Sequence, residues 1–163
     1  MKKNITIVCL NDNIRIDCAR EFAKANQMFF LDVDDLLDFE LIDRKMVSIK
    51  YGDECLTKLE KECMERVASY ENCVYSVSCD LFLANDNRFF LEDTEIVYLE
   101  THLENIDLKK VKNKTEREKI TQNLEISQNI NDYLKNTVKN VVKDADLKTT
   151  SEIVQEISNL INN

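Results

Sequence analysis

The chain has 163 residues, a length that fits one domain built around one hydrophobic core. Its 44% hydrophobic and 33% charged residues are typical of a soluble globular protein, and no apolar run approaches the roughly 20 residues of a membrane-spanning helix. The net charge of −9 argues against a nucleic-acid-binding surface and against an anionic membrane, because both require a basic patch.

The cysteines and the N-terminus indicate the compartment. None of the six cysteines forms a C-x-x-C pair, and His102 is the single histidine. We therefore expect reduced, mostly buried thiols and no bound metal. Residues 1–10 have neither the apolar length nor the cleavage site of a signal peptide, which predicts a cytoplasmic protein.

The first predicted elements form a strand, a helix and a second strand. Residues 5–10 and 28–31 are apolar runs rich in β-branched and aromatic residues, as in buried parallel strands. Between them, residues 13–26 have apolar positions at helical spacing. The predicted buried face of this helix holds Ile14, Cys18, Phe22 and Ala25.

The second strand ends in Asp32 and Asp34. These carboxylates are expected at the carboxyl edge of a parallel sheet, where open α/β folds bind ligands. A structural interpretation stands beside this one, because aspartate is also favoured where a strand ends and a helix begins.

Strands alternate with helices along the rest of the chain. Further strands are predicted at residues 73–77, 95–99 and 140–143. Further helices are predicted at residues 35–42, 53–70, 85–91 and 124–139, and after the capping residues Thr149 and Thr150. Residues 45–51 are predicted as a connection, Gly52 as a turn or helix C-cap, and the charged residues 102–119 as a solvated helix or mobile segment. This alternation predicts an α/β fold with a parallel sheet covered by helices on both faces.

The order of these elements resembles that of the shikimate kinases, small P-loop kinases of the nucleoside-monophosphate-kinase type. The features that match are the strand at 5–10, Ala19-Arg20 and Ala23-Lys24 in the first helix, the D-x-D of Asp32 and Asp34, Gly52-Asp53-Glu54, and the ending 141–144 before an amphipathic helix. The resemblance implies one three-layer αβα domain over residues 1–163, with five parallel strands in the order 2-3-1-4-5. It also implies a reduced lid segment at residues 103–123.

The phosphate-binding motif of that family, G-x-x-x-x-G-K-[ST], falls on residues 9–16, which contain no glycine. Glycine is needed there because backbone N–H groups must close around phosphate oxygens with no side chain in the way. By the resemblance, Arg15 replaces the lysine and Ile16 replaces the magnesium-binding hydroxyl. The other degenerate positions are Cys9, Asp12, Asn13 and Ile14. Asp12 and Asp17 add negative charge that would repel a polyphosphate.

The substrate side departs from the family pattern in the same way. Where the resemblance implies arginines and a glycine-rich turn, the chain has Thr57, residues 78–80, residues 120–121 and Asn131. Arg117, three residues before Ile120, is the one candidate stand-in for a lid arginine. Cys79 falls in the substrate turn, where a redox or nucleophilic role competes with a buried thiol.

Three hypotheses follow. The first is a pseudoenzyme that keeps the kinase fold, binds no cofactor, and associates with a protein partner or with itself. The second is a divergent active shikimate kinase that uses ATP and Mg, with Arg15 as phosphate clamp and Asp34 as base. The third is a binding module for another small ligand, in a closed apolar pocket near Asp34 and Tyr75.

Overall fold

A computed structural model describes residues 3–41, 44–102 and 114–162. Its sheet has five parallel strands in the order β2-β3-β1-β4-β5, which confirms the predicted order. The strands are β1 (Ile5–Cys9), β2 (Phe29–Asp32), β3 (Cys73–Ser78), β4 (Glu95–Leu99) and β5 (Asn140–Val142).

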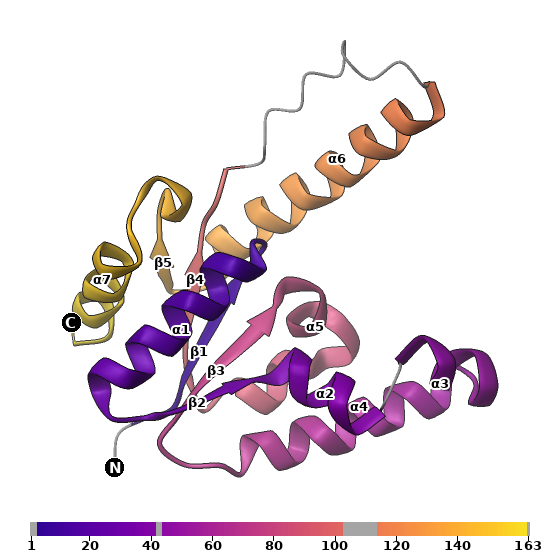
Figure 1. The fold of residues 1–163 in the computed structure, drawn as a ribbon, viewed down its shortest axis with the longest axis horizontal. Helices are drawn as coiled ribbons and strands as arrows, with labels where there is room; N and C mark the ends of the chain where they lie inside the picture. Colours follow the sequence, from indigo (N-terminus) through magenta and orange to yellow (C-terminus); the bar gives the residue numbers. More distant parts are fainter. Residues whose placement is uncertain (1–2, 42–43, 103–113, 163) are drawn as a thin grey trace.

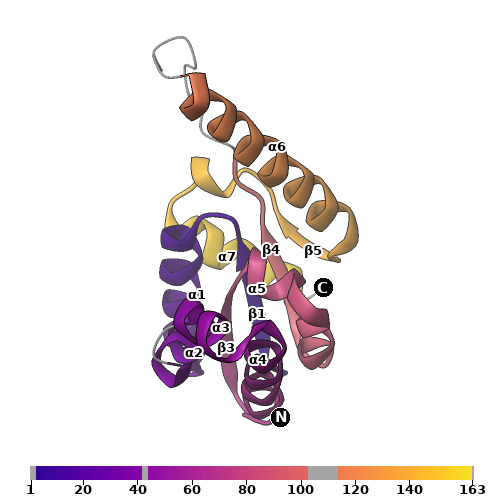
Figure 2. The ribbon, with the colours of Figure 1, turned by 90° about the vertical axis from the view of Figure 1, so that its right-hand side faces the viewer.

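Helices cover both faces of this sheet, so the predicted three-layer architecture is confirmed (Figure 1). The first half of the chain holds α1 (Asp12–Asn26), α2 (Val33–Leu41), α3 (Arg44–Tyr51) and α4 (Asp53–Ala68). The second half holds α5 (Cys79–Leu83), the 3₁₀ helix η1 (Ala84–Leu91), α6 (Lys114–Thr137), the 3₁₀ helix η3 (Ala145–Leu147) and α7 (Thr150–Asn162). The N-terminal part of α6 projects well beyond the sheet (Figure 2).

The core follows from the alternation of side chains along the central strands. Ile5, Ile7 and Cys9 of β1 face α1 and α7, whereas Val8 faces the layer that contains α2, α4 and α5. All residues of β1 are buried, which is why its sequence is apolar apart from Thr6, whose hydroxyl is hydrogen-bonded to that of Thr94 (2.7 Å).

The predicted buried face of α1 is wrong at one position, Ala25. Cys18 and Phe22 are buried as expected, but Ala25 is exposed and Ala23 is buried instead. Arg15 is also buried on this face, and the reason lies in the contacts of its guanidinium, described below.

The segment predicted as a connection at residues 45–51 is wrong, since it forms α3. Nothing in it breaks a helix until Gly52, which has φ 87°. Gly52 therefore separates two helices: its N–H donates to Ser48 O (2.8 Å) at the end of α3, and its carbonyl accepts from Leu56 N (3.3 Å) in α4. A positive φ of this size favours glycine, the only one in the chain.

The two predictions for residues 102–139 merge into one helix as far as the structure describes them. The 24 residues of α6 begin at Lys114, so the charged residues 114–119 belong to the helix that was predicted from residue 124. Of the expected lid segment, residues 103–113 lie outside the described residues and residues 114–123 are the first turns of α6. Within the described chain, no helix has the length and apolar character needed to cross a membrane.

Candidate functional site

The candidate site lies at the carboxyl edge of the sheet, where β1 meets α1 and where β2 and β3 end. A cleft of about 430 Å³ opens there. Its lining includes two arginines, Arg15 and Arg44, and six aspartates: Asp12, Asp32, Asp34, Asp35, Asp38 and Asp80. The cleft is therefore acidic, as is the chain as a whole.

Arg15 projects from the first turns of α1 and is enclosed by acceptors. Its Nη1 donates to Asp32 Oδ2 (3.1 Å) and to Ser76 Oγ (2.6 Å), and its Nη2 donates to Asp12 Oδ1 (3.0 Å). The carboxylate of Asp34 lies 3.5 Å from Nη1. Because the Arg15 and Asp32 side chains are only 3% and 5% exposed, this is a buried ion pair in a polar network.

Asp32 is held from three sides. Besides Arg15, the hydroxyl of Ser76 donates to its Oδ2 (2.8 Å) and the backbone N–H of Asp35 donates to its Oδ1 (3.0 Å). The second contact lies at the start of α2, where an accepted N–H bond compensates the helix terminus. Asp32 thus has the helix-start role of the structural interpretation and also neutralises Arg15.

Asp34 bridges to the end of β3. It accepts hydrogen bonds from Ser78 N (2.8 Å) and Ser78 Oγ (2.7 Å). Burial raises the pKa of Asp34 above its ordinary value, although the Ser78 hydrogen bonds and the charge of Arg15 oppose the rise. Its side chain is 17% exposed, so one edge of the carboxyl group still faces the cleft.

The connection between β1 and α1 is short. β1 ends at Cys9 and α1 begins at Asp12, so that only Leu10 and Asn11 lie between them. The Asn11 side chain accepts a hydrogen bond from Ile14 N (3.2 Å), which makes it the N-cap of α1. Residues 12–14 form the first turn of α1, so their backbone N–H groups point along the helix axis and do not line an open loop.

The remaining predicted positions are mostly structural. Asn131 is buried, and its Oδ1 accepts from Tyr98 Oη (2.5 Å). Cys79 is buried, and desolvation raises the pKa of its thiol, which keeps it protonated and unreactive. Thr57 is half-buried on α4, and Arg117 lies on α6 with its side chain outside the description.

The expected closed apolar pocket near Asp34 is not what the described residues form. The space beside Asp34 is the acidic cleft, and Tyr75 does not line it. The Tyr75 side chain is buried, and its hydroxyl donates to Val67 O (2.9 Å) of α4.

Sequence reasoning missed Ser76 as a site residue. Asp32 and Ser76 are register partners in the β2–β3 ladder, as are Cys9 and Ser78 in the β1–β3 ladder. Strand alternation in the sequence could have placed Ser76 on the face that α1 covers, but its position beside Asp32 comes from the register of β2 and β3.

Comparisons with solved structures define the class of protein first. The shikimate kinase of Acinetobacter baumannii, solved in complex with shikimate, is 18% identical, with 98% of this chain and 92% of that chain covered and a TM-score of 0.70. The shikimate kinase of Bacteroides thetaiotaomicron is 17% identical, with 99% of both chains covered and a TM-score of 0.73. The shikimate kinase of Aquifex aeolicus is 18% identical, with 98% of this chain and 96% of that chain covered and a TM-score of 0.69. The fold is that of the P-loop-kinase-like α/β proteins.

The shikimate kinase family model matches residues 17–162. The chain therefore belongs to the shikimate kinase family. The match begins at Asp17, directly after the segment in which the glycine-rich motif was sought. No curated protein sequence matches the chain.

Proposed function

We propose that this chain is a catalytically inactive member of the shikimate kinase family that has lost ATP and shikimate binding and acts in the cytoplasm by binding. The observation that carries the proposal is that Arg15 is already paired with aspartates of this chain. It stands where the resemblance places the phosphate-binding lysine, and its charge is shared among Asp12, Asp32 and Asp34.

The residues at the β1–α1 junction do not fit a nucleotide. A phosphate cradle needs several free backbone N–H groups around an open loop. Here the loop has only two residues, and the amide of Ile14 is already bonded to Asn11. Asp12 in the first turn of α1 adds a negative charge at the end where the helix dipole would otherwise favour an anion.

The charge of the cleft also supports the proposed loss of shikimate binding. Shikimate carries a carboxylate, and six aspartates face the cleft against two arginines. One of those arginines, Arg15, is already neutralised, and the other, Arg44, is paired with Asp38 (2.6 Å). An anionic substrate would therefore meet unfavourable charge on entry.

A binding role agrees with the surface of α2 and α3. Four large apolar side chains on these two helices are exposed: Phe39, Met46, Ile49 and Tyr51. Phe39 and Ile49 are 83% and 79% exposed, and apolar exposure of this kind is typical of protein interaction surfaces. We place contact with a protein partner, or with a second copy, on these helices. All six cysteines are free, in keeping with a reducing compartment.

The test is a calorimetric titration of the full chain with Mg·ATP, with an active shikimate kinase as the positive control. We expect no heat of binding up to millimolar nucleotide, whereas a micromolar Kd would refute the proposal. Arg15→Gln, checked for folding by circular dichroism, is the matched variant. Nucleotide binding that this variant abolishes would establish Arg15 as a working phosphate clamp.

The second candidate function is a divergent active shikimate kinase, and Asp34 favours it. Its carboxyl group faces the cleft with a raised pKa, as a general base requires. The discriminating assay measures shikimate-dependent ADP formation with the wild type and with Asp34→Asn. Turnover that Asp34→Asn abolishes would support this second function, and turnover absent from both would support the first.

A further inference from the structure

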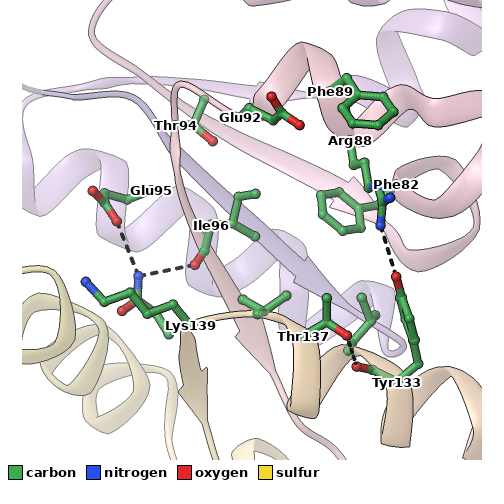
Figure 3. Close-up of a pocket in the computed structure, with 13 residues that line it drawn as sticks. Phe82, Arg88, Phe89, Glu92, Thr94, Glu95, Ile96, Tyr133, Thr137 and Lys139 are labelled. Atoms are coloured by element: carbon green, nitrogen blue, oxygen red, sulfur yellow. Dashed lines mark hydrogen bonds between the residues drawn. The ribbon is translucent and has the colours of Figure 1, made fainter.

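A second cavity lies on the opposite edge of the sheet from the acidic cleft. It is enclosed by the amino-terminal ends of β4 and β5, by η1 and by the C-terminal turns of α6 (Figure 3). Its volume is about 350 Å³. Small-molecule sites have volumes of about 300–1,000 Å³, so this one is sized for a small ligand.

The cavity wall is mainly apolar and aromatic. Phe82 of α5 and Ile96 of β4 contribute from the sheet side, and Leu134 and Val138 contribute from α6 and the residue after it. Phe89 of η1 is half-exposed at the opening. Such a wall favours a flat apolar group, because rings stack on or pack edge-to-face against other rings.

Arg88 supplies a positive charge beside Phe89 and Tyr133 of the cavity lining. Its Nη1 donates to Tyr133 Oη (3.0 Å), which links η1 to α6, and its guanidinium lies 5.2 Å from the centre of the Phe89 ring (Figure 3). Neither partner carries a negative charge. Of the described residues, none provides a carboxylate at ion-pair distance from Arg88, so its charge is available to a ligand.

The acidic residues of the cavity do not cancel this charge. Glu95 lies near Lys139, away from Arg88 (Figure 3), and it is already paired with Lys3 (3.0 Å) and bonded to Asn140 Nδ2 (3.4 Å). Glu92 is exposed at the end of η1. The lining thus holds two cations, Arg88 and Lys139, and two carboxylates, Glu92 and Glu95, and Arg88 is the cation beside the Phe89 ring.

We propose that this cavity binds a small aromatic carboxylate, with the ring among Phe82, Ile96 and Val138 and the carboxylate paired with Arg88. The guanidinium fork matches a carboxylate in a two-point hydrogen bond. This site lies apart from the acidic cleft, so its occupation does not depend on whether the cleft binds nucleotide.

The test is an NMR titration of the full chain with 3-phenylpropionate as the probe. We expect amide shifts confined to residues 82–96 and 133–140. The neutral analogue 3-phenylpropan-1-ol is expected to bind about tenfold more weakly, because it lacks the charge-assisted hydrogen bond.

Two variants complete the test. Arg88→Gln should weaken the acid about tenfold and leave the alcohol unchanged. Arg20→Gln is the matched control, since Arg20 also lies over a ring, that of Phe30 at 5.3 Å, but on α1 outside the cavity. Thr137→Phe, a substitution at an exposed lining residue, should block both probes by filling the space.

Several results would overturn the proposal. If the acid and the alcohol bound with equal Kd, the charge of Arg88 would have no part in binding. Equal weakening by Arg88→Gln and Arg20→Gln would show a general loss of positive charge instead of a site. Shifts centred on residues 9–16 and 32–34 would place the probe in the acidic cleft.

Discussion

Replacing Arg15 by methionine tests whether its charge is structural or free to bind phosphate. Methionine keeps much of the apolar stem and removes the guanidinium, so no large cavity opens. Asp32, with a side chain only 5% exposed, would then carry a buried negative charge without its cation. Breaking a buried pair in this way costs about 3–5 kcal/mol.

The other contacts of Arg15 change this figure little. Asp12 is 67% exposed, and a solvent-exposed pair contributes only about 0–1 kcal/mol. Asp32 keeps its bonds from Ser76 and from the Asp35 amide, which limits the loss. We therefore expect Arg15→Met to lower the free energy of unfolding by about 3–5 kcal/mol, a large part of the roughly 5–15 kcal/mol of a typical domain.

Urea unfolding followed by circular dichroism measures this change. Lys24→Met is the control on the same helix, since its side chain is 78% exposed and its pair with Glu21 is worth at most about 1 kcal/mol. The double variant Arg15→Met/Asp32→Asn should recover about 1–3 kcal/mol, because the unpaired charge is gone. A loss below about 1 kcal/mol for Arg15→Met would refute the reasoning and leave Arg15 as a residue kept for a ligand.

Three further predictions concern the cap, the buried carboxyl group and the exposed surface. Asn11→Ala should cost about 1 kcal/mol in urea unfolding and Asn11→Ser much less, since serine also caps a helix; equal losses would contradict the capping role. The raised pKa of Asp34 means that its ionisation opposes folding as pH rises from the ordinary value of 3.8 through the folded value, so Asp34→Asn should be more stable relative to wild type at pH 7 than at pH 3; a difference independent of pH would contradict this. If the chain self-associates through α2 and α3, light scattering should give a mass above 19.1 kDa that Phe39→Ser/Ile49→Ser returns to the monomer; a monomeric wild type would exclude self-association.

The strands were predictable because each is a short apolar run between polar turns. β4 was predicted at residues 95–99 and is found there, and β3 differs by one residue. The segment that became α3 was missed because its eight residues are too few for a clear helical period, and its apolar residues Met46, Ile49 and Tyr51 are exposed instead of buried in the core.

The site was predicted as residues but not as a network. Arg15 lies three, four and seven positions before Cys18, Ala19 and Phe22, which is the spacing of the buried face, so a charge at this position requires a partner. The sequence does not show that Asp32, 17 residues away, provides it, because this contact depends on how α1 lies across the sheet. Ser76 enters the network only through the register of β2 and β3.

The network around Arg15 has a consequence for the proposed loss of nucleotide binding. A lysine at position 15 would still leave Asn11 capping the helix and three aspartates around its ammonium group. Replacing those aspartates while Arg15 is kept would leave a buried cation without its counter-charges. On the proposed loss of nucleotide binding, a phosphate site at this junction would require several substitutions made together, because Arg15 and the aspartates around it stabilise one another.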